Sequence, residues 1–354
     1  MPAASSVCAM TILDVTRLPM LARLADAWPA PVSAAILADR GGFSEWALQP
    51  LEQVRAMRSA LRQPHLMRAT LIENVGFDCP PRFPFNQLRN IALSRCVEQR
   101  VVIIDVDFVP HPADGSLPRQ LAAFNMEPQE ALVLPAFDVA ARVASGSSAA
   151  SLPAVIDKSA LRMLVANGQL VTFGDANGTR DVWSFGHRCT ITSRWLEHSK
   201  SYEVQHCNPY YEPYIMLSRA TAPPFDESFR GRGIDKISYI YELFARGVTF
   251  KVSPDAFVIH HPHSEARPAN CSQERIDAAA RAAGATEPEE IEAYNRNPGA
   301  ACTIKFLERL ETQYGYAPKT HGHGEFRKNS GRHWLCDARH VRPKPQPRLM
   351  MVSG

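Results

Sequence analysis

The chain has 354 residues, of which 45% are apolar and 21% charged, values typical of a globular protein with room for one large α/β domain or two small ones. Lys and Arg number 39 against 36 Asp and Glu, which gives a formal net charge of +3. No basic stripe dominates the body of the chain, so this balance argues against nucleic acid as the main partner.

The first hundred residues alternate between apolar strand patterns and amphipathic helix patterns. Strands are predicted at 7–13, 32–37 and 69–75, and helices at 17–28, 51–61 and 85–96. A strand–helix–strand opening is typical of a parallel sheet with helices on its faces, so we expect an α/β architecture.

The remainder of the chain carries shorter elements. Strands are predicted at 131–136, 214–218, 249–252 and 257–260, helices at 159–167, 237–245, 288–294 and 303–314, and loops at 144–150, 174–180 and 225–233. From residue 317 onward Pro, His, Lys and Arg dominate without apolar periodicity. Residues 317–354 are therefore predicted to form a basic, disordered tail.

The sequence gives no positive prediction from membrane-spanning segments, secretory signals or cysteine spacing. No segment approaches the ~20 consecutive apolar residues of a membrane-spanning helix, and the first residues lack the charged start and apolar run of a secretory signal. As written, the chain is expected to be soluble and to carry no secretory address. Its eight cysteines are scattered singly without a Cys-x-x-Cys pair, so a zinc site of that spacing is not expected, while disulfides are neither required nor excluded.

One stretch near residue 100 organises the chain. Residues 101–104 are four consecutive β-branched residues, which predicts a strand buried on both faces of a central sheet. Asp105 and Asp107 follow at once, and Pro110 is expected to end the regular structure. On an extended backbone the two carboxylates would lie on one side, where they repel unless a cation sits between them. Oxygen ligands suit Mg²⁺ or Mn²⁺, so a metal site is favoured over two Asp residues that merely cap a turn.

Other polar residues could complete a site for a nucleotide. His260 closes a predicted strand and belongs to the group His260-His261-Pro262-His263, so its imidazole is a candidate third metal ligand. Arg89, on the helix before the central strand, could bind diphosphate oxygens; the alternative is a surface salt bridge.

Two carboxylates are candidates for a catalytic base. Asp235 follows a loop that contains Gly231 and Gly233, and it lies at the start of a predicted helix, where it could deprotonate a bound alcohol. A plain helix cap fits the same position. Glu212, which opens the predicted strand at 214–218, is the other candidate base.

Eight short segments stand in a fixed order between about residue 7 and residue 316. They are Trp28-Pro-Ala-Pro-Val-Ser33, Phe83-Pro-Phe-Asn-Gln-Leu-Arg-Asn-Ile-Ala92, Asp105-Val-Asp-Phe-Val-Pro110, Leu134-Pro-Ala-Phe137, Val182-Trp-Ser-Phe-Gly-His187, Tyr211-Glu-Pro-Tyr-Ile215, Phe225-Asp-Glu-Ser-Phe-Arg-Gly-Arg-Gly-Ile-Asp-Lys236 and Ile259-His-His-Pro-His263. In this order they resemble glycosyltransferase family 49, the family of LARGE-type glucuronyltransferases.

The resemblance implies an α/β fold of the GT-A type, which is a Rossmann-like nucleotide-sugar fold with a mostly parallel central sheet. It implies one domain over residues 1–316, with a nucleotide-binding half at about 1–110 and an acceptor half at 111–316. It also implies inverting transfer of a sugar from a UDP-sugar to a hydroxyl of a glycan or glycoprotein acceptor, with Mn²⁺ or Mg²⁺ as cofactor.

The resemblance also assigns roles to residues. The metal ligands it implies are Asp105, Asp107 and His260. The residues assigned to the nucleotide-sugar are Thr11, Asn86, Arg89 and Asp105. For a glucuronate donor, the cations available to meet the sugar carboxylate are Arg230, Arg232 and Lys236. The family implies a place in the Golgi lumen, although the chain as written shows no signal or anchor.

Two other functions compete with this interpretation. A module that binds UDP or a sugar but has lost turnover would keep the same fold. A phosphatase of the haloacid-dehalogenase type could use Asp105 as nucleophile with Lys158 and Asp175 as partners. That fold normally has its nucleophile near the start of the chain, whereas here about a hundred residues precede Asp105.

Overall fold

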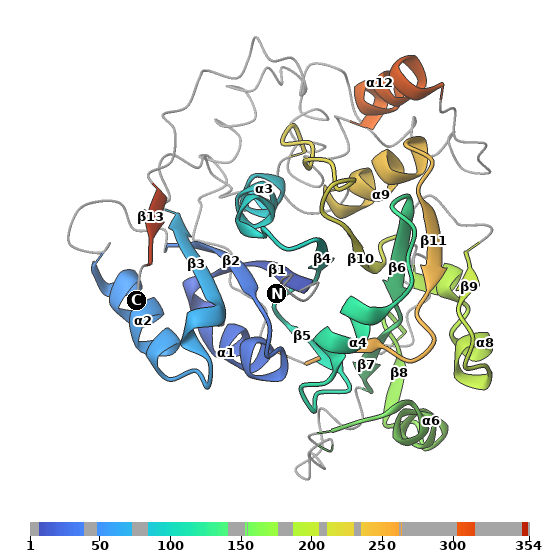
Figure 1. The fold of residues 1–354 in the computed structure, drawn as a ribbon, viewed down its shortest axis with the longest axis horizontal. Coiled ribbons are helices and arrows are strands. Elements are labelled where there is room, and N and C mark those ends of the chain that lie inside the picture. Colours follow the sequence, from blue (N-terminus) through green and yellow to red (C-terminus); the bar gives the residue numbers. More distant parts are fainter. Residues whose placement is uncertain are drawn as a thin grey trace, which may run out of the picture.

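The computed structural model describes residues 7–38, 48–72, 84–140, 153, 155–175, 187–204, 211–229, 235–261, 263, 303–315 and 349–352. The described elements form two β-sheets with helices on both sides (Figure 1). The helices are α1 (Leu18–Ala27), α2 (Leu48–Ser59), α3 (Phe85–Arg95), α4 (Leu117–Ala123), α6 (Lys158–Ala166), α8 (Thr192–Glu197), α9 (Asp235–Ala245) and α12 (Thr303–Tyr314).

The large sheet has nine strands in the order β13-β3-β2-β1-β4-β10-β6-β11-β9. Its strands are β1 (Val7–Asp14), β2 (Val32–Leu37), β3 (Met67–Ile72), β4 (Arg100–Ile103), β6 (Glu130–Leu134), β9 (Tyr202–Glu203), β10 (Tyr214–Ser218), β11 (Thr249–Val252) and β13 (Leu349–Met351). Six of the nine, β3, β2, β1, β4, β6 and β11, run in one direction, and β13, β10 and β9 run in the other. The predicted α/β fold with a mostly parallel central sheet is confirmed.

The small sheet has four strands in the order β5-β12-β7-β8. They are β5 (Phe108–His111), β7 (Ala136–Val139), β8 (Leu170–Thr172) and β12 (Phe257–His260). This sheet begins where β4 and β6 end, because β5 follows β4 and β7 follows β6 within a few residues. It therefore brings segments that are far apart in sequence to the carboxyl end of the central strands.

The large sheet is buried on both faces, which explains why its strands read as continuous apolar runs. On one face, alternate residues of β1 such as Met10 and Ile12 belong to the buried cluster to which α3 and α9 also contribute. On the other face, α1, α2 and α4 cover the remaining residues, such as Ala9 and Leu13. In Figure 1, α3 lies above this sheet and α1 and α2 lie below it.

Most predicted elements occur within one to three residues of their expected bounds, and β2, β10, β11, β12 and α12 match them. The predicted helix at 288–294, the loop at 144–150 and most of the loop at 174–180 lie outside the described residues. The described parts of the predicted loops 225–233 and 174–180, which are residues 225–229 and 174–175, contain no helix or strand.

Two predictions are corrected. Pro110 does not end the regular structure, because it lies inside β5, opposite Val258 of β12. As β5 is an edge strand, a residue without an N–H is tolerated there. The tail also contains order, because β13 pairs with β3 at the edge of the large sheet and Val352 is buried.

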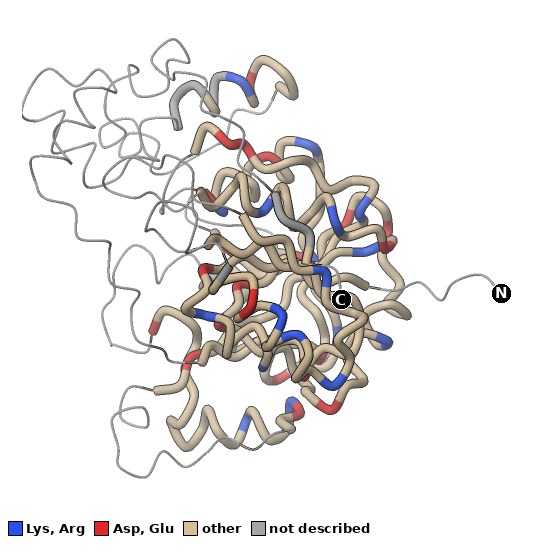
Figure 2. The backbone as a smooth tube through the Cα atoms, turned by 90° about the vertical axis from the view of Figure 1, so that its left-hand side faces the viewer, with Lys and Arg blue, Asp and Glu red and all other residues tan. Residues whose placement is uncertain are grey.

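Two global observations complete the description. No helix among the described residues is long and apolar enough to cross a membrane. Acidic and basic residues are interspersed along the described backbone (Figure 2).

A disulfide joins Cys8 at the start of β1 to Cys96 at the end of α3, and Cys189 is also disulfide-bonded.

Candidate active site

The site begins at the turn that follows β4. The backbone N–H of Phe108 donates to the carbonyl of Asp105 at 3.1 Å, so Asp105 and Asp107 belong to a turn and not to an extended strand. The expected alternation along an extended backbone is therefore wrong. In this turn the two carboxylates have separate sets of partners.

Asp107 is surrounded by positively charged and imidazole groups. Its Oδ2 lies 3.0 Å from Arg17 Nη1, 2.9 Å from His263 Nε2 and 3.8 Å from His260 Nε2. Its other oxygen, Oδ1, is buried and has no hydrogen-bond partner in the described part of the chain. Burial alone would raise the pKa of Asp107, but the hydrogen bond with His260 and the charges of His260 and Arg17 hold that pKa below its usual range.

His260, at the end of β12, contacts neighbouring strands of the small sheet and lies beside Asp107. Its Nδ1 lies 2.7 Å from Oδ1 of Asp138 on β7, and its ring centroid is 5.0 Å from that of Phe108. Burial would lower the pKa of His260, but Asp107 and Asp138 together raise it to about 9. Asp107, His260 and His263 form a group whose potential ligand atoms all lie within 4.8 Å of one another.

Asp105 is not part of that group. Its Oδ2 accepts hydrogen bonds from Lys236 Nζ at 2.8 Å and Tyr214 Oη at 3.0 Å. Lys236 also forms an ion pair with Glu212 at 3.1 Å, and Arg89 lies 4.0 Å from Asp105. The result is a compact network of two carboxylates, two cations and a phenol between the ends of β4, β10 and α9.

The carboxylates of this network differ in electrostatic environment. Burial raises the pKa of Glu212, and the charge of Lys236 only partly offsets this effect. Burial would also raise the pKa of Asp105, but the charges of Lys236 and Arg89 outweigh it and lower that pKa. The two carboxylates on either side of Lys236 therefore differ in how readily they accept a proton.

The predicted nucleotide-side residues of α3 are buried and bonded to a predicted base. Arg89 Nη1 donates to Asp235 Oδ2 at 2.6 Å and to Asn86 Oδ1 at 3.0 Å. Asn86 in turn donates to the carbonyl of Asp226 at 2.8 Å. Arg89 is thus not in a surface salt bridge, and only 7% of the Asp235 side chain is exposed.

Thr11 lies in the middle of β1, opposite Ala34 of β2. It is buried, and its hydroxyl has no hydrogen-bond partner among the described residues.

The structure adds residues that the sequence did not assign to the metal or donor site. The sequence assigned no role at the site to Arg17 or Asp138, and it placed His263 only in the group that contains His260. The signals for them are faint: Arg17 directly follows the first strand and its turn, and Asp138 follows the segment Leu134-Pro-Ala-Phe137.

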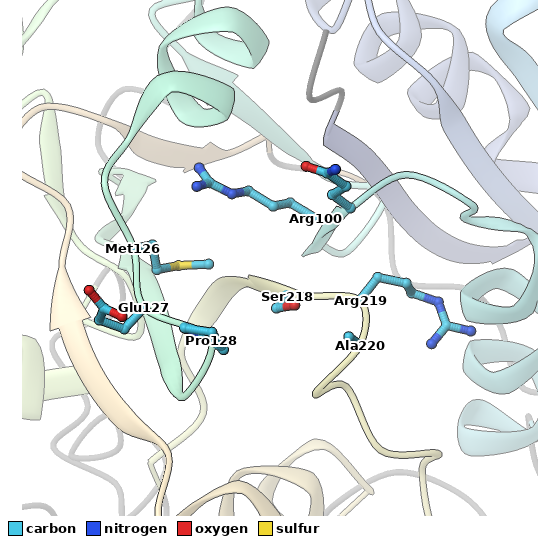
Figure 3. A pocket seen from close by; sticks show the side chains of 8 residues that line it. Arg100, Met126, Glu127, Pro128, Ser218, Arg219 and Ala220 are labelled. Atoms are coloured by element: carbon cyan, nitrogen blue, oxygen red, sulfur yellow. The ribbon is translucent and has the colours of Figure 1, made fainter. Parts of the chain in front are cut away.

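A separate hollow with a volume of about 470 Å³ lies at the start of β4, opposite the end that carries Asp105. Figure 3 shows Arg100, Met126, Glu127 and Arg219 around it. The two arginines already donate to the carbonyls of Leu121 and Cys96. None of the predicted site residues lines this hollow.

The described chain is an α/β domain with a mostly parallel sheet; its central strand β4 is followed by an acidic turn, and His260 at the end of the small sheet and His263 lie beside that turn. The family described as "Glycosyl-transferase for dystroglycan" matches residues 62–286, and the chain belongs to this family. The predicted resemblance to glycosyltransferase family 49 is thereby confirmed.

Several relatives are similar over most of the chain. Mouse "Xylosyl- and glucuronyltransferase LARGE2" is 34% identical over 74% of this chain and 35% of its own length. "Glycosyltransferase-like protein gnt14" of Dictyostelium discoideum is 27% identical over 74% of this chain and 38% of its own length. The chain spans about a third of the length of the curated relatives it matches.

Among solved structures, GalNAc-T7 with UDP, GalNAc and Mn²⁺ aligns at a TM-score of 0.41 and 10% identity. The alignment covers 95% of this chain and 56% of that chain. This likeness is too distant to bear on the chemistry of the site.

Proposed function

We propose that this domain transfers a sugar from a UDP-sugar to a hydroxyl of a glycan acceptor, with inversion and with the help of a divalent cation. The observation that carries the proposal is the group formed by Asp107, His260 and His263 at the end of the central strand, whose potential ligand atoms all lie within 4.8 Å of one another. Oδ2 of Asp107 lies 2.9 Å from His263 Nε2 and 3.8 Å from His260 Nε2, and Oδ1 is buried without a hydrogen-bond partner among the described residues. A carboxylate together with two imidazoles is a donor set that suits Mn²⁺. Family membership supports the transfer of a sugar.

We assign Asp107 and His260 as residues that would hold the cation, and we add His263 to the predicted set. When bound, the cation would neutralise charge on the diphosphate of the donor. Asp105 is assigned to the donor side together with Lys236, because its Oδ2 already accepts hydrogen bonds from Lys236 and Tyr214. Arg89 and Asn86 are assigned a supporting role behind this network, where Arg89 holds Asp235.

Glu212 is preferred over Asp235 as the catalytic base. A base must reach the acceptor hydroxyl and must take up a proton. The side chain of Glu212 is 27% exposed and burial raises its pKa, so it can meet both demands. Asp235 is nearly enclosed and its Oδ2 accepts a hydrogen bond from Arg89, so an acceptor hydroxyl has less access to it.

The donor sugar is proposed to be glucuronate, with xylose as the alternative, because the relatives are named xylosyl- and glucuronyltransferases. The structure weakens one predicted contact. Lys236 is already paired with Asp105 and Glu212, so it is a poor candidate to meet the glucuronate carboxylate. Arg230 and Arg232 lie outside the described residues.

The test is UDP release from a panel of UDP-sugars by the purified chain, with a glycan acceptor and with either Mn²⁺ or EDTA. We expect one donor to turn over in Mn²⁺ only, and Asp107→Asn to abolish turnover. Asp114→Asn is the matched control, because Asp114 lies in an exposed turn where its carboxylate accepts hydrogen bonds from Ser116. Binding of UDP without turnover of any donor would contradict the proposal, and so would hydrolysis of a phosphate monoester in place of transfer.

The base assignment has its own test. Glu212→Gln should lower kcat about a hundredfold or more while leaving the affinity for UDP nearly unchanged. Asp235→Asn should retain most of the UDP-sugar turnover if the fold is intact. The reverse result would return the role of base to Asp235.

A further inference from the structure

Asp138 is a buried carboxylate that the proposed transfer reaction does not use. It lies on β7, where its register partner on the parallel strand β12 is His260. Neighbouring residues at this register hold their side chains on the same face of the small sheet. This places Asp138 Oδ1 2.7 Å from His260 Nδ1.

The Asp138 carboxylate is itself fixed by the backbone. Its second oxygen, Oδ2, accepts the backbone N–H of Gly174 at 3.0 Å, and Gly174 lies two residues after the end of β8. Gly174 has a φ of 88°, a conformation that favours glycine. The carboxylate is thus held at both oxygens, by β12 on one side and by the end of β8 on the other.

The imidazole of His260 is confined as well. Its ring centroid is 5.0 Å from Phe108 and 5.5 Å from Phe173, and both neighbours are aromatic rings. With the Nδ1 edge directed to Asp138, the Nε2 edge is directed to Asp107, 3.8 Å from its Oδ2. A carboxylate that accepts the second N–H of a metal-binding histidine fixes both the orientation and the basicity of the ring.

We propose that Asp138 is a positioning residue for the cation site. It holds a proton on Nδ1 of His260 and thereby turns Nε2 towards Asp107, where a divalent cation would bind. Asp138 does not itself contact the cation or the sugar. The inference rests on the proposed cation dependence of the transfer reaction. Asp138 would orient the His260 imidazole before the cation binds.

The first experiment needs no metal. In protein carrying ¹⁵N-labelled histidine, the Nδ1–H of His260 should give a protected ¹H–¹⁵N signal, which His260→Gln identifies by removing it. Asp138→Ala should abolish the protection, and Asp138→Asn should retain part of it because an amide oxygen can still accept. An unchanged signal in Asp138→Ala would overturn the proposal.

The second experiment measures Mn²⁺ affinity from the electron paramagnetic resonance signal of free Mn²⁺. Asp138→Ala should bind Mn²⁺ about ten- to a hundredfold more weakly than the wild type. Asp138→Asn should show a smaller loss, and Asp114→Ala, in an exposed turn, should show none. Should Asp138→Ala fail to fold, Asp138→Asn carries the test, and equal Mn²⁺ affinity in Asp138→Asn and wild type would then overturn the proposal.

The two experiments separate this inference from the proposed function. If the wild type binds no Mn²⁺ but its Nδ1–H is protected by Asp138, the cation dependence fails and the use of Asp138 as a positioning residue for a cation fails with it. If Mn²⁺ binds and supports turnover equally in wild type and Asp138→Ala, the proposed function stands and only the role of Asp138 falls.

Discussion

At the scale of single residues, Arg17 and Asp107 show how the site is balanced. The Arg17 guanidinium donates to Asp107 Oδ2 at 3.0 Å and lies 3.4 Å from His263 Nε2. A positive charge therefore already stands beside the ligands to which we assign a divalent cation. Because this ion pair is partly exposed, it is worth at most about 1 kcal/mol and can be displaced.

We predict that Arg17→Gln raises the affinity for Mn²⁺ roughly three- to tenfold. In the wild type Mn²⁺ must displace the Arg17–Asp107 ion pair, which is worth about 1 kcal/mol, and the variant lacks this ion pair. The measurement is a Mn²⁺ titration at neutral pH. Arg55→Gln is the control, since Arg55 is an exposed residue of α2. Weaker binding by Arg17→Gln would show that Arg17 supports the cation site and does not compete for it.

A second residue, Ile191, carries backbone strain. Its φ of 46° and ψ of 68° lie in the left-handed region, which costs a β-branched residue roughly 1–2 kcal/mol. The side chain is 48% exposed, so little buried apolar area repays this cost. Its carbonyl accepts the backbone N–H of Trp195, which anchors the start of α8.

We predict that Ile191→Asn increases the free energy of unfolding by about 1 kcal/mol, because Asn tolerates the left-handed conformation better than Ile. Urea unfolding followed by circular dichroism measures the change. Val155→Asn is the matched control: Val155 is 50% exposed, and its φ is not positive. A lower stability of Ile191→Asn would mean that the Ile side chain contributes packing that outweighs the strain.

At the scale of secondary-structure elements, the site depends on how α3 and α9 are held against the sheet. The first turn of α9 supplies Asp235 and Lys236, which bond to Arg89 of α3 and to Asp105 after β4. The C-terminal end of α3 is joined to β1 by the Cys8–Cys96 disulfide. The helix is thus connected to α9 through Arg89 near its middle and to the sheet at its C-terminal end.

We predict that the double variant Cys8→Ala, Cys96→Ala loses up to about 4 kcal/mol of stability, because the disulfide closes a long loop in the unfolded chain. The double variant is preferred to a reducing agent because Cys189 is also disulfide-bonded. Urea unfolding gives the free energy. An unchanged midpoint would show that packing of α3 on β1 and β2 is sufficient without the covalent bond.

At the scale of the whole molecule, two buried histidines make the fold sensitive to acid. Burial lowers the pKa of His111 to about 4, and burial with the charge of Lys236 lowers that of His187 to about 3. In the unfolded chain both would titrate near 6.5. Between pH 6.5 and the lowered pKa values of the folded protein, these histidines bind protons in the unfolded chain but stay neutral in the folded protein. Their contribution to stability is therefore full above pH 6.5 and falls as the pH is lowered.

We predict that each of these histidines costs roughly 2 kcal/mol of stability at pH 5 relative to pH 7.5. His111→Phe should recover most of its share, because a phenyl ring can keep the stacking on Phe257 and cannot be protonated. Urea unfolding at the two pH values measures this difference. The exposed His198, replaced by Phe, is the control, and equal pH dependence in wild type and His111→Phe would contradict the prediction.

The sequence predicted the elements well because their signals are local. The β-branched run at 101–104, the stripe of α1 and the proline that precedes α3 each act within a few residues. The missed strand β5 shows the limit. Pro110 is incompatible with a central strand but not with an edge strand, and whether a strand lies at an edge depends on residues far along the chain.

The site was predicted in part for the same reason. Asp105 and Asp107 could be found because they end a buried strand, and His260 because it ends another. Their partners could not be found, since Arg17 lies 90 residues before Asp107 and Asp235 lies 146 residues after Arg89. The choice between Glu212 and Asp235 as base likewise needed their exposure and ion pairs.

By itself, then, the sequence determined the α/β class, the order of strands and helices, the family resemblance and the acidic turn, because periodicity and short motifs act over a few residues. Only the tertiary structure decided which charges meet. Strand register places Asp138 beside His260, and the turn after β4 sends Asp105 to Lys236 and Asp107 to the histidines. Such pairings are set by the packing of distant segments, whose free energy no local pattern of residues records.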